Sequence, residues 1–205
     1  MDNAFVYFIL QGLSDWTPQI LSEYHGMKSE AAAAGLFWYE AGGIVSTFTS
    51  GFVSDRLHGN RGLTALLFSA LCAPGILVIM MTPVIVGGDG GVTRPALLSV
   101  GLFIVGAGAN GPKTMCGLEV RERFPEAAGA AGALLGLMGQ IGATSAGWPL
   151  TQAYQRYGGW GAVLQLLLSA AVCASAMFGG LIILRTRAWP LLSQSQSQLT
   201  KLKSN

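Results

Sequence analysis

Charged residues are scarce in this sequence. Only 11% of its 205 residues are Asp, Glu, Lys or Arg, whereas soluble domains usually carry about 25%. The 12 Lys and Arg nearly balance the 10 Asp and Glu, so bulk charge gives no support for a nucleic-acid partner. Hydrophobic residues make up 51% of the chain. This composition excludes an ordinary soluble domain and indicates a protein that spans a membrane.

Cysteine is rare as well. Cys72, Cys116 and Cys173 lie in separate apolar segments, and no pair has the spacing of a metal site or a redox motif. We interpret the three thiols as small buried hydrophobic groups, and we predict no metal site and no cofactor. A signal peptide is not expected, because the N-terminus lacks a basic flank and a small-residue cleavage site.

Glycine, by contrast, is abundant, and its 29 copies are interleaved with Ala, Leu and Val. Small residues let helix backbones approach closely inside a bilayer. A spanning helix needs about 20 mostly apolar residues. Polar residues interrupt the first of the predicted spans, which we therefore expect to line a pathway. The six predicted spans are 4–21, 31–53, 63–86, 96–120, 127–154 and 159–184.

The six spans form one predicted transmembrane domain over residues 1–187. A polar tail, 188–205, follows it and is predicted to be cytoplasmic and disordered. With six spans, both termini lie on the same side of the membrane. The basic residues on that side are Arg56, Arg61, Arg121, Arg123, Arg185, Arg187, Lys201 and Lys203, against Lys28, Arg94 and Arg156 on the other. The positive-inside rule therefore places both termini in the cytoplasm.

The loop between the second and third spans carries Gly51, Asp55, Arg56, Gly59 and Arg61. An aspartate at a helix end beside two arginines can form charge-assisted hydrogen bonds. Such bonds would act as a conformational latch, holding neighbouring helices in one state and releasing them in another. The alternative is a solvated loop that merely satisfies the positive-inside rule. The pattern resembles the cytoplasmic loop motif of the major facilitator superfamily.

Four further stretches resemble one branch of that superfamily, the organophosphate:phosphate antiporters. This branch includes bacterial glycerol-3-phosphate and hexose-phosphate transporters and the eukaryotic glucose-6-phosphate translocase. The stretches follow the family order and are 5–7 with 15–18, 38–43, 110–117 and 124–147. The resemblance implies an all-α membrane protein whose six transmembrane helices form the C-terminal half of a major facilitator fold. Substrate would then bind near the bilayer midplane, between two such halves.

The resemblance also implies a function. It points to a secondary transporter that exchanges a sugar phosphate, similar to glucose-6-phosphate, for inorganic phosphate by alternating access. The implied partners are an organophosphate, phosphate, the lipid bilayer and an N-terminal six-helix half, from the same gene or from a partner chain. The implied location is the endoplasmic reticulum membrane in a eukaryote and the plasma membrane otherwise.

Two alternative functions stay open at this point. One is a substrate sensor or receptor built on the same fold, and the other is a transporter of a less charged solute. An intramembrane enzyme is not predicted, because neither His25 nor His58 lies mid-span and no nucleophile–base pair is visible.

Leu10 stands where the family has a basic residue in its seventh helix. Lys113 is the candidate replacement, because it lies eight residues inside Arg121, which is about 12 Å of helix rise. The neighbouring pair 111–112, Gly-Pro, is predicted to break the helix and expose carbonyl groups. The alternative role for Lys113 is structural pairing with a carboxylate such as Glu119.

Three more residues complete the predicted substrate site around Lys113. Glu40 lies mid-span, where a carboxylate is costly unless it is paired or protonated. Its candidate roles are an ion pair with Lys113, proton coupling, and a hydrogen bond to sugar hydroxyls. Asn110 and Gln140 occupy helix positions where family members often place tyrosines toward the cavity.

Overall fold

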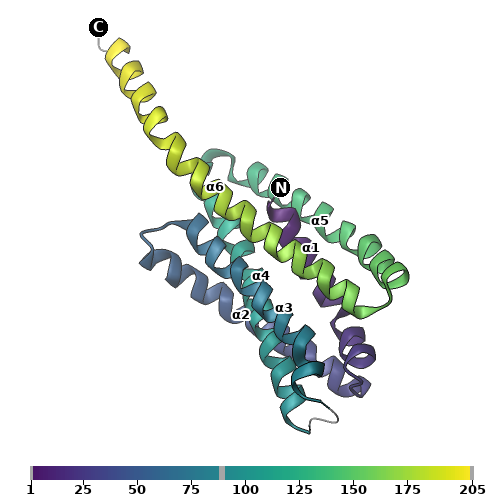
Figure 1. Cartoon of the computed structure of the whole chain (residues 1–205). Coiled ribbons are helices and arrows are strands. Elements are labelled where there is room, and N and C mark those ends of the chain that lie inside the picture. The colour runs from purple at the N-terminus through teal and green to yellow at the C-terminus, as the bar shows by residue number, and fades with distance from the viewer. Residues whose placement is uncertain (1, 88–90, 204–205) are drawn as a thin grey trace.

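The computed structural model describes residues 2–87 and 91–203, with side chains described for 4–87 and 91–184. All regular structure in these ranges is helical (Figure 1), so the all-α prediction is confirmed. The elements are α1 (Asp2–Gln19), η1 (Ile20–Tyr24), α2 (Ser29–Arg56), α3 (Arg61–Ile85), α4 (Thr93–Arg123), η2 (Pro125–Ala127), α5 (Ala128–Tyr157) and α6 (Trp160–Lys203). Each predicted span coincides with one α-helix, apart from a few residues at the ends and from α6, which continues well beyond position 184.

Four segments of the described chain are long and apolar enough to cross a membrane. They are Arg61–Ile85, Thr93–Arg123, Pro125–Tyr157 and Trp160–Leu184, which correspond to α3, α4, η2 with α5, and the first part of α6. The chain is therefore an integral multi-pass membrane protein. Helices α1 and α2 carry more polar residues, including Gln11, Asp15 and Glu40, and their crossing of the bilayer stays a prediction.

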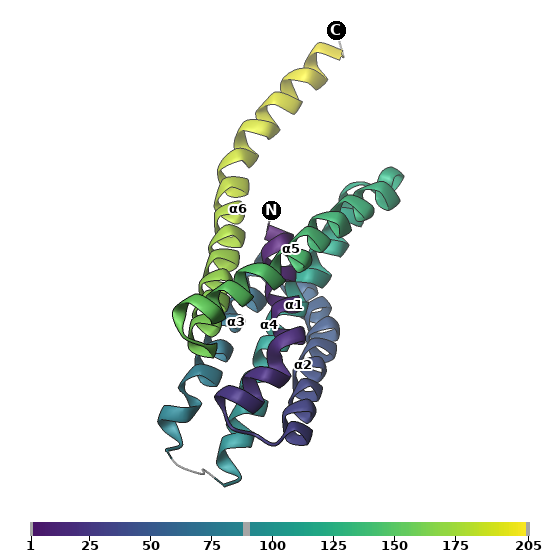
Figure 2. The same cartoon turned by 90° about the vertical axis from the view of Figure 1, so that its right-hand side faces the viewer.

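Helix α4 lies in the middle of one group of helices. It packs along both α2 and α3, while α1 packs against α5 and α6 (Figure 2). The chain runs up and down between the two ends of the bundle, so α1 begins and α6 finishes toward the same end. This arrangement matches the even number of spans that the sequence predicts.

Close contact between α2 and α4 depends on glycine. A Cβ atom added to Gly106 would collide with the main-chain oxygen of Tyr39, and one added to Gly42 would collide with the oxygen of Phe103. The same helix meets α3 at Gly108, where an added Cβ would lie 2.8 Å from the amide nitrogen of Cys72. Lipid supplies no hydrophobic force between helices, so backbone contact of this kind stabilises their association through van der Waals packing.

The predicted helix break at Gly111–Pro112 is wrong, because α4 is continuous from Thr93 to Arg123. Both residues are buried, and a Cβ on Gly111 would lie 2.5 Å from Cγ of Phe68, in α3. Proline removes one backbone hydrogen bond from a helix. Neighbouring helices make that loss tolerable in a membrane protein. Gly111 and Pro112 therefore pack within the bundle and do not open the helix to expose carbonyl groups to a ligand.

The three thiols differ in burial. Cys72 is buried and Cys116 is partly buried, but Cys173 is exposed on α6, so its predicted burial is wrong. An apolar side chain can remain on the outside of a membrane protein, because lipid covers it.

Helix α6 continues through the segment predicted to be a polar tail, as far as Lys203. Residues 204–205 lie outside the described part of the chain, and the domain boundary at 187 stays a prediction. The same is true of the orientation. Four residues in the positive-inside count lie where no side chain is described, namely Arg185, Arg187, Lys201 and Lys203.

The glycine contact makes a testable prediction. Gly106→Ala should force α2 and α4 apart and cost about 1–3 kcal/mol, the usual range for overpacking. Gly117→Ala on the same helix is the matched control, because an added Cβ there meets nothing within 4 Å. Thermal melting of the detergent-purified protein should show a lower Tm for Gly106→Ala alone. Equal melting temperatures for the two variants would contradict the close-contact account.

Candidate functional site

Arg61 is the centre of a polar cluster where α2 and α4 end and α3 begins. Its guanidinium donates through Nη2 to Oε1 of Glu122 at 2.8 Å and through Nε to Oε2 at 3.3 Å. Nη1 donates to the Ser54 hydroxyl at 2.9 Å and lies 3.8 Å from Oδ1 of Asp55. We call Ser54, Asp55, Arg61 and Glu122 the Arg61 cluster. A two-pronged contact of this kind fixes geometry as well as charge.

The other predicted latch residues shape the loop around this cluster. Gly59 has φ +74° and follows His58 at φ +57°, so the chain turns through two left-handed residues before α3. Glycine adopts that conformation without strain. Arg56 does not join the cluster, since its guanidinium lies 4.4 Å from the centre of the Phe52 ring. At Gly51 an added Cβ would meet nothing within 4 Å, so packing does not require glycine there.

Sequence reasoning missed Glu122 and Ser54. Glu122 had a visible signal, because it lies between Arg121 and Arg123 in the loop placed on the same side as Arg61. Ser54 had no such signal, since nothing in the sequence distinguishes it from other serines at helix ends. The cluster joins three helices. Its charged groups are partly exposed, whereas Ser54 is buried, and exposed ion pairs contribute little to stability. Such contacts can break without unfolding the bundle, as a latch requires.

Lys113 extends from α4 over an aromatic ring of α1. Its Nζ lies 5.2 Å from the centre of the Tyr7 ring, within the range of a cation–π interaction. The same ring packs on α5 at Gly139, where an added Cβ would lie 2.9 Å from Cε2 of Tyr7. Gln140, the next residue, is exposed. Tyr7 thus lies between Lys113 of α4 and Gly139 of α5, and sequence reasoning gave it no role.

The remaining predicted site residues have different surroundings. Glu40 is exposed on α2, and in the described part of the chain no ion pair joins it to Lys113. Asn110 is partly buried and donates from Nδ2 to its own helix, at the oxygen of Gly106, 3.1 Å away. It packs on Gly43 of α2, where an added Cβ would lie 2.5 Å from Nδ2. Glu119 is paired with Arg123 at 3.1 Å.

Neither of the two described cavities is lined by Lys113, Glu40, Asn110 or Gln140. Lys113, Glu40 and Gln140 are exposed instead, whereas Asn110 is partly buried between α4 and α2. Lys113 and its neighbours could therefore bind a ligand only against another surface.

At the opposite end of the bundle, Glu23 of η1 holds the turn between α5 and α6. Its Oε2 accepts hydrogen bonds from Trp160 Nε1 at 2.7 Å and from the Tyr154 hydroxyl at 3.2 Å. The Trp160 ring also packs on Trp16 and Tyr154, with centroids 5.7 Å and 4.8 Å apart. This contact was not predicted, because Glu23 is distant from both partners in the sequence.

His25 follows η1 and is only 2% exposed. Among the described residues neither ring nitrogen has a hydrogen-bond partner. Burial, with a smaller contribution from the Arg94 guanidinium, lowers the pKa of His25 to about 4. The ring is therefore neutral at pH 7, and it adds no positive charge for an anionic ligand at this end.

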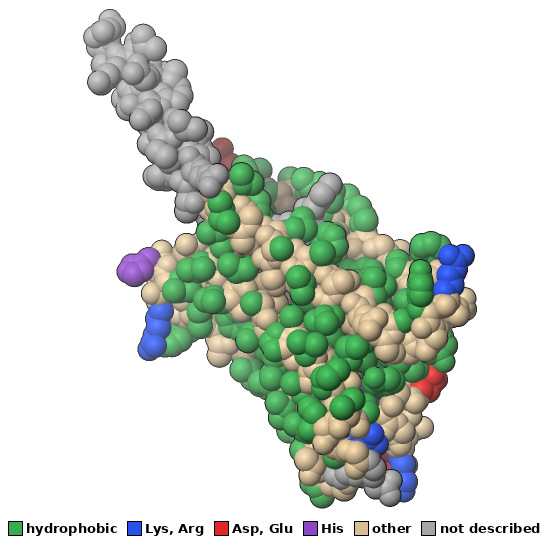
Figure 3. Space-filling view, in the orientation of Figure 1, with side chains coloured by type: hydrophobic (Ala, Val, Ile, Leu, Met, Phe, Trp, Pro, Cys, Tyr) green, Lys and Arg blue, Asp and Glu red, His purple; other side chains and the backbone are tan. Residues whose placement is uncertain are grey.

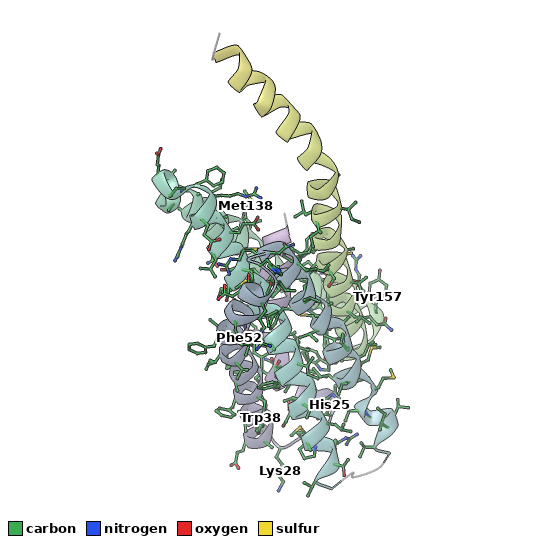
Figure 4. The ribbon with its side chains drawn as sticks, turned by 90° about the vertical axis from the view of Figure 1, so that its left-hand side faces the viewer. His25, Lys28, Trp38, Phe52, Met138 and Tyr157 are labelled. Carbon is green, nitrogen blue, oxygen red and sulfur yellow. The ribbon has the colours of Figure 1, made fainter. Side chains whose placement is uncertain are left out.

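The outer faces of the molecule are apolar. Trp38 and Phe52 point away from the bundle on α2 (Figure 4), and both are more than 40% exposed. In the view of Figure 3, hydrophobic side chains cover the middle of the face while Lys and Arg lie near its edges. This distribution fits a surface that meets lipid tails or another apolar protein face.

Comparison with known proteins identifies relatives, although no family model matches the chain. The chain is 36% identical over 145 residues to the glycerol-3-phosphate transporter of Bacillus subtilis, covering 70% of this chain and 31% of the relative. It is 31% identical over 182 residues to the glycerol-3-phosphate transporter of Haemophilus influenzae, covering 84% and 38%. It is also 30% identical over 175 residues to the membrane sensor protein UhpC of Escherichia coli, covering 83% and 38%.

The chain thus spans between 31% and 38% of the length of these relatives. Most of its own length takes part in the match, as expected for one part of a larger transporter fold. The all-α membrane architecture and the ordered family motifs agree with these relatives. The chain belongs to the major facilitator superfamily, in its organophosphate:phosphate antiporter branch.

Proposed function

We propose that this chain forms the C-terminal half of a secondary transporter for a phosphorylated small molecule. The cargo is a sugar phosphate similar to glucose-6-phosphate, exchanged for inorganic phosphate by alternating access. The observation that carries the proposal is Lys113, an exposed cation well inside the candidate span α4. Charge within a span is costly unless it faces a wet cavity or a partner. Relatives named as glycerol-3-phosphate and hexose phosphate transport proteins support the cargo class.

In this proposal Lys113 contacts the phosphate and Tyr7 positions the ammonium group. Gln140 and Glu40 supply hydrogen-bonding groups for the sugar hydroxyls, and Glu40 is also the candidate for proton coupling. Asn110 would first have to exchange its intrahelical bond to Gly106 for a bond to the cargo. Lys113 compensates for Leu10, whose position in the family is basic.

The second wall of the site is an N-terminal six-helix half, from the same gene or from a partner chain. Helices α5 and α2 have exposed apolar surface against which this second half could pack. Only 11% of the most apolar window of α5 is buried, against 50% for α4, and α2 exposes Phe37, Ile44 and Phe48. In the complete protein all six helices cross the bilayer, with both termini in the cytoplasm. The membrane is the endoplasmic reticulum in a eukaryote and the plasma membrane otherwise.

A second candidate function is substrate sensing without transport. It is favoured by Leu10, which removes one expected positive charge, and by the similarity to a relative named as a membrane sensor protein. A transporter for a less charged solute fits the same departure. In both alternatives the ligand binds at the same residues around Lys113.

The transport proposal predicts a specific effect of Lys113. In liposomes containing the complete protein, Lys113→Ala should weaken the binding of glucose-6-phosphate by about tenfold or more, because charge-assisted hydrogen bonds contribute about 1.5–3 kcal/mol. Lys113→Arg should retain most of the exchange of labelled phosphate. Lys28→Ala, at an exposed lysine before α2, is the control and should leave exchange unchanged.

Three results separate the functions. Exchange that depends on Lys113 supports the transporter. Binding of glucose-6-phosphate without any flux assigns the sensor. Flux of an uncharged sugar, with no response to any phosphate ester, would overturn the phosphate cargo.

The Arg61 cluster makes a separate prediction about rate. Glu122→Gln should slow exchange roughly threefold to tenfold, the range for mutations that bias a two-state element, with little change in Tm because the contact is exposed. Exchanging the two charges, as Arg61→Glu with Glu122→Arg, should restore part of the rate. Glu126→Gln, which alters an exposed carboxylate in the same region, is the matched control. A Glu122→Gln variant with the exchange rate of the unchanged protein would refute the latch.

A further inference from the structure

A groove of about 850 Å³ lies between α5 and α6, beside the turn that joins them. Its polar lining includes Gln152 and Arg156 of α5 and Gln165 of α6. Trp148 and Tyr157 contribute aromatic walls and are 74% and 78% exposed. None of the predicted cargo residues lines this groove, so it is a separate feature of the molecule.

Small residues create the hollow. Ala153 and Gly158 line it from the α5 side, and Gly161 and Ala162 line it from the first turn of α6. A Cβ atom added to Gly161 would meet nothing within 4 Å. The space in front of these residues is therefore open, and a larger side chain at 161 would enter it without displacing the helices.

The groove offers donors and a positive charge. Arg156 has five N–H donors and forms no ion pair within the part of the chain whose side chains are described. Glu23, the carboxylate that binds this turn, is already held by Trp160 and Tyr154. A free guanidinium beside two amide side chains is suited to a phosphate group, because arginine matches the geometry of phosphate oxygens.

The position of the groove favours a lipid. It lies where the candidate span 125–157 ends and the span 160–184 begins, which is the depth of the headgroups. Trp and Tyr are enriched at that level of a membrane. Trp148 lies nine residues before Tyr157, so the groove wall reaches about 14 Å along α5 from the headgroup level. A ligand with a phosphate at one end and an apolar chain at the other would match this sequence of surfaces.

We propose that the groove between α5 and α6 binds one anionic phospholipid. Arg156 contacts the headgroup phosphate, and Trp148 packs beside the part of the acyl chain nearest the headgroup. Gln152 and Gln165 hydrogen-bond the remaining headgroup oxygens. A free phosphate ion would use Arg156 but would leave the apolar depth of the groove empty. The lipid fills both parts, and its binding is independent of the identity of the cargo.

Native mass spectrometry of the intact protein in detergent tests the proposal. The probes are palmitoyl-oleoyl phosphatidylglycerol, the matching phosphatidylcholine, and inorganic phosphate. We expect one phosphatidylglycerol to be retained about tenfold more strongly than phosphatidylcholine. Both lipids offer a phosphate to Arg156, but the choline ammonium of phosphatidylcholine repels the guanidinium and cancels the net charge of the headgroup. Arg156→Gln should remove that preference. Gly161→Leu should block both lipids by filling the groove while Tm stays unchanged.

Lys28→Gln is the matched control, because it removes an exposed positive charge predicted to lie on the same side of the bilayer, outside the groove. It should retain the lipid preference. Equal retention of phosphatidylglycerol by Gly161→Leu and the unchanged protein would overturn the proposal. So would displacement of the lipid by millimolar inorganic phosphate, which would assign the groove to a free anion instead.

Discussion

The direct backbone contact of α4 with α2 is the constraint on which this structure depends. Gly42 and Gly106 leave no room for a side chain between the two helices. Because the contact is so close, α4 lies at the centre of its group. Asn110 of α4 is packed against Gly43 of α2, whereas Lys113 is on an exposed face. Lys113 reaches Tyr7 of α1 on that face.

Charge is distributed along the bundle in a way that separates two tasks. The Arg61 cluster connects the ends of three helices at one end of the molecule, where water is available and ion pairs exchange easily. Lys113 lies deeper, where a charge is kept only for a ligand or a partner. Arg61 and Lys113 therefore have separate surroundings: the first belongs to an ion-paired cluster at the helix ends, and the second to a cation–π contact within a candidate span.

The sequence predicted the helices well, because their apolar runs are long and their separating loops are short and polar. It also predicted Arg61 and Asp55, since charge and glycine mark that loop. It did not predict the partner Glu122 or the ring of Tyr7, because contacts between distant helices leave no local pattern. The break expected at Gly111–Pro112 failed for a related reason. Packing of Gly111 on Phe68, which no local rule anticipates, keeps α4 continuous.

The most direct test of the account is whether the surface around Lys113 is open to water in the absence of cargo and is shielded when cargo binds. A single cysteine at position 140, made as Gln140→Cys with the native thiols replaced, leaves Lys113 intact. It places the label on an exposed residue of α5, next to Gly139, which packs on Tyr7. The account predicts that a membrane-impermeant thiol reagent modifies this cysteine and that glucose-6-phosphate slows the reaction. A protein that retains only Cys173, exposed on α6, should resist the same reagent. A cysteine at 140 that reacts only with lipid-soluble reagents, unaffected by any phosphate ester, would contradict the proposed site.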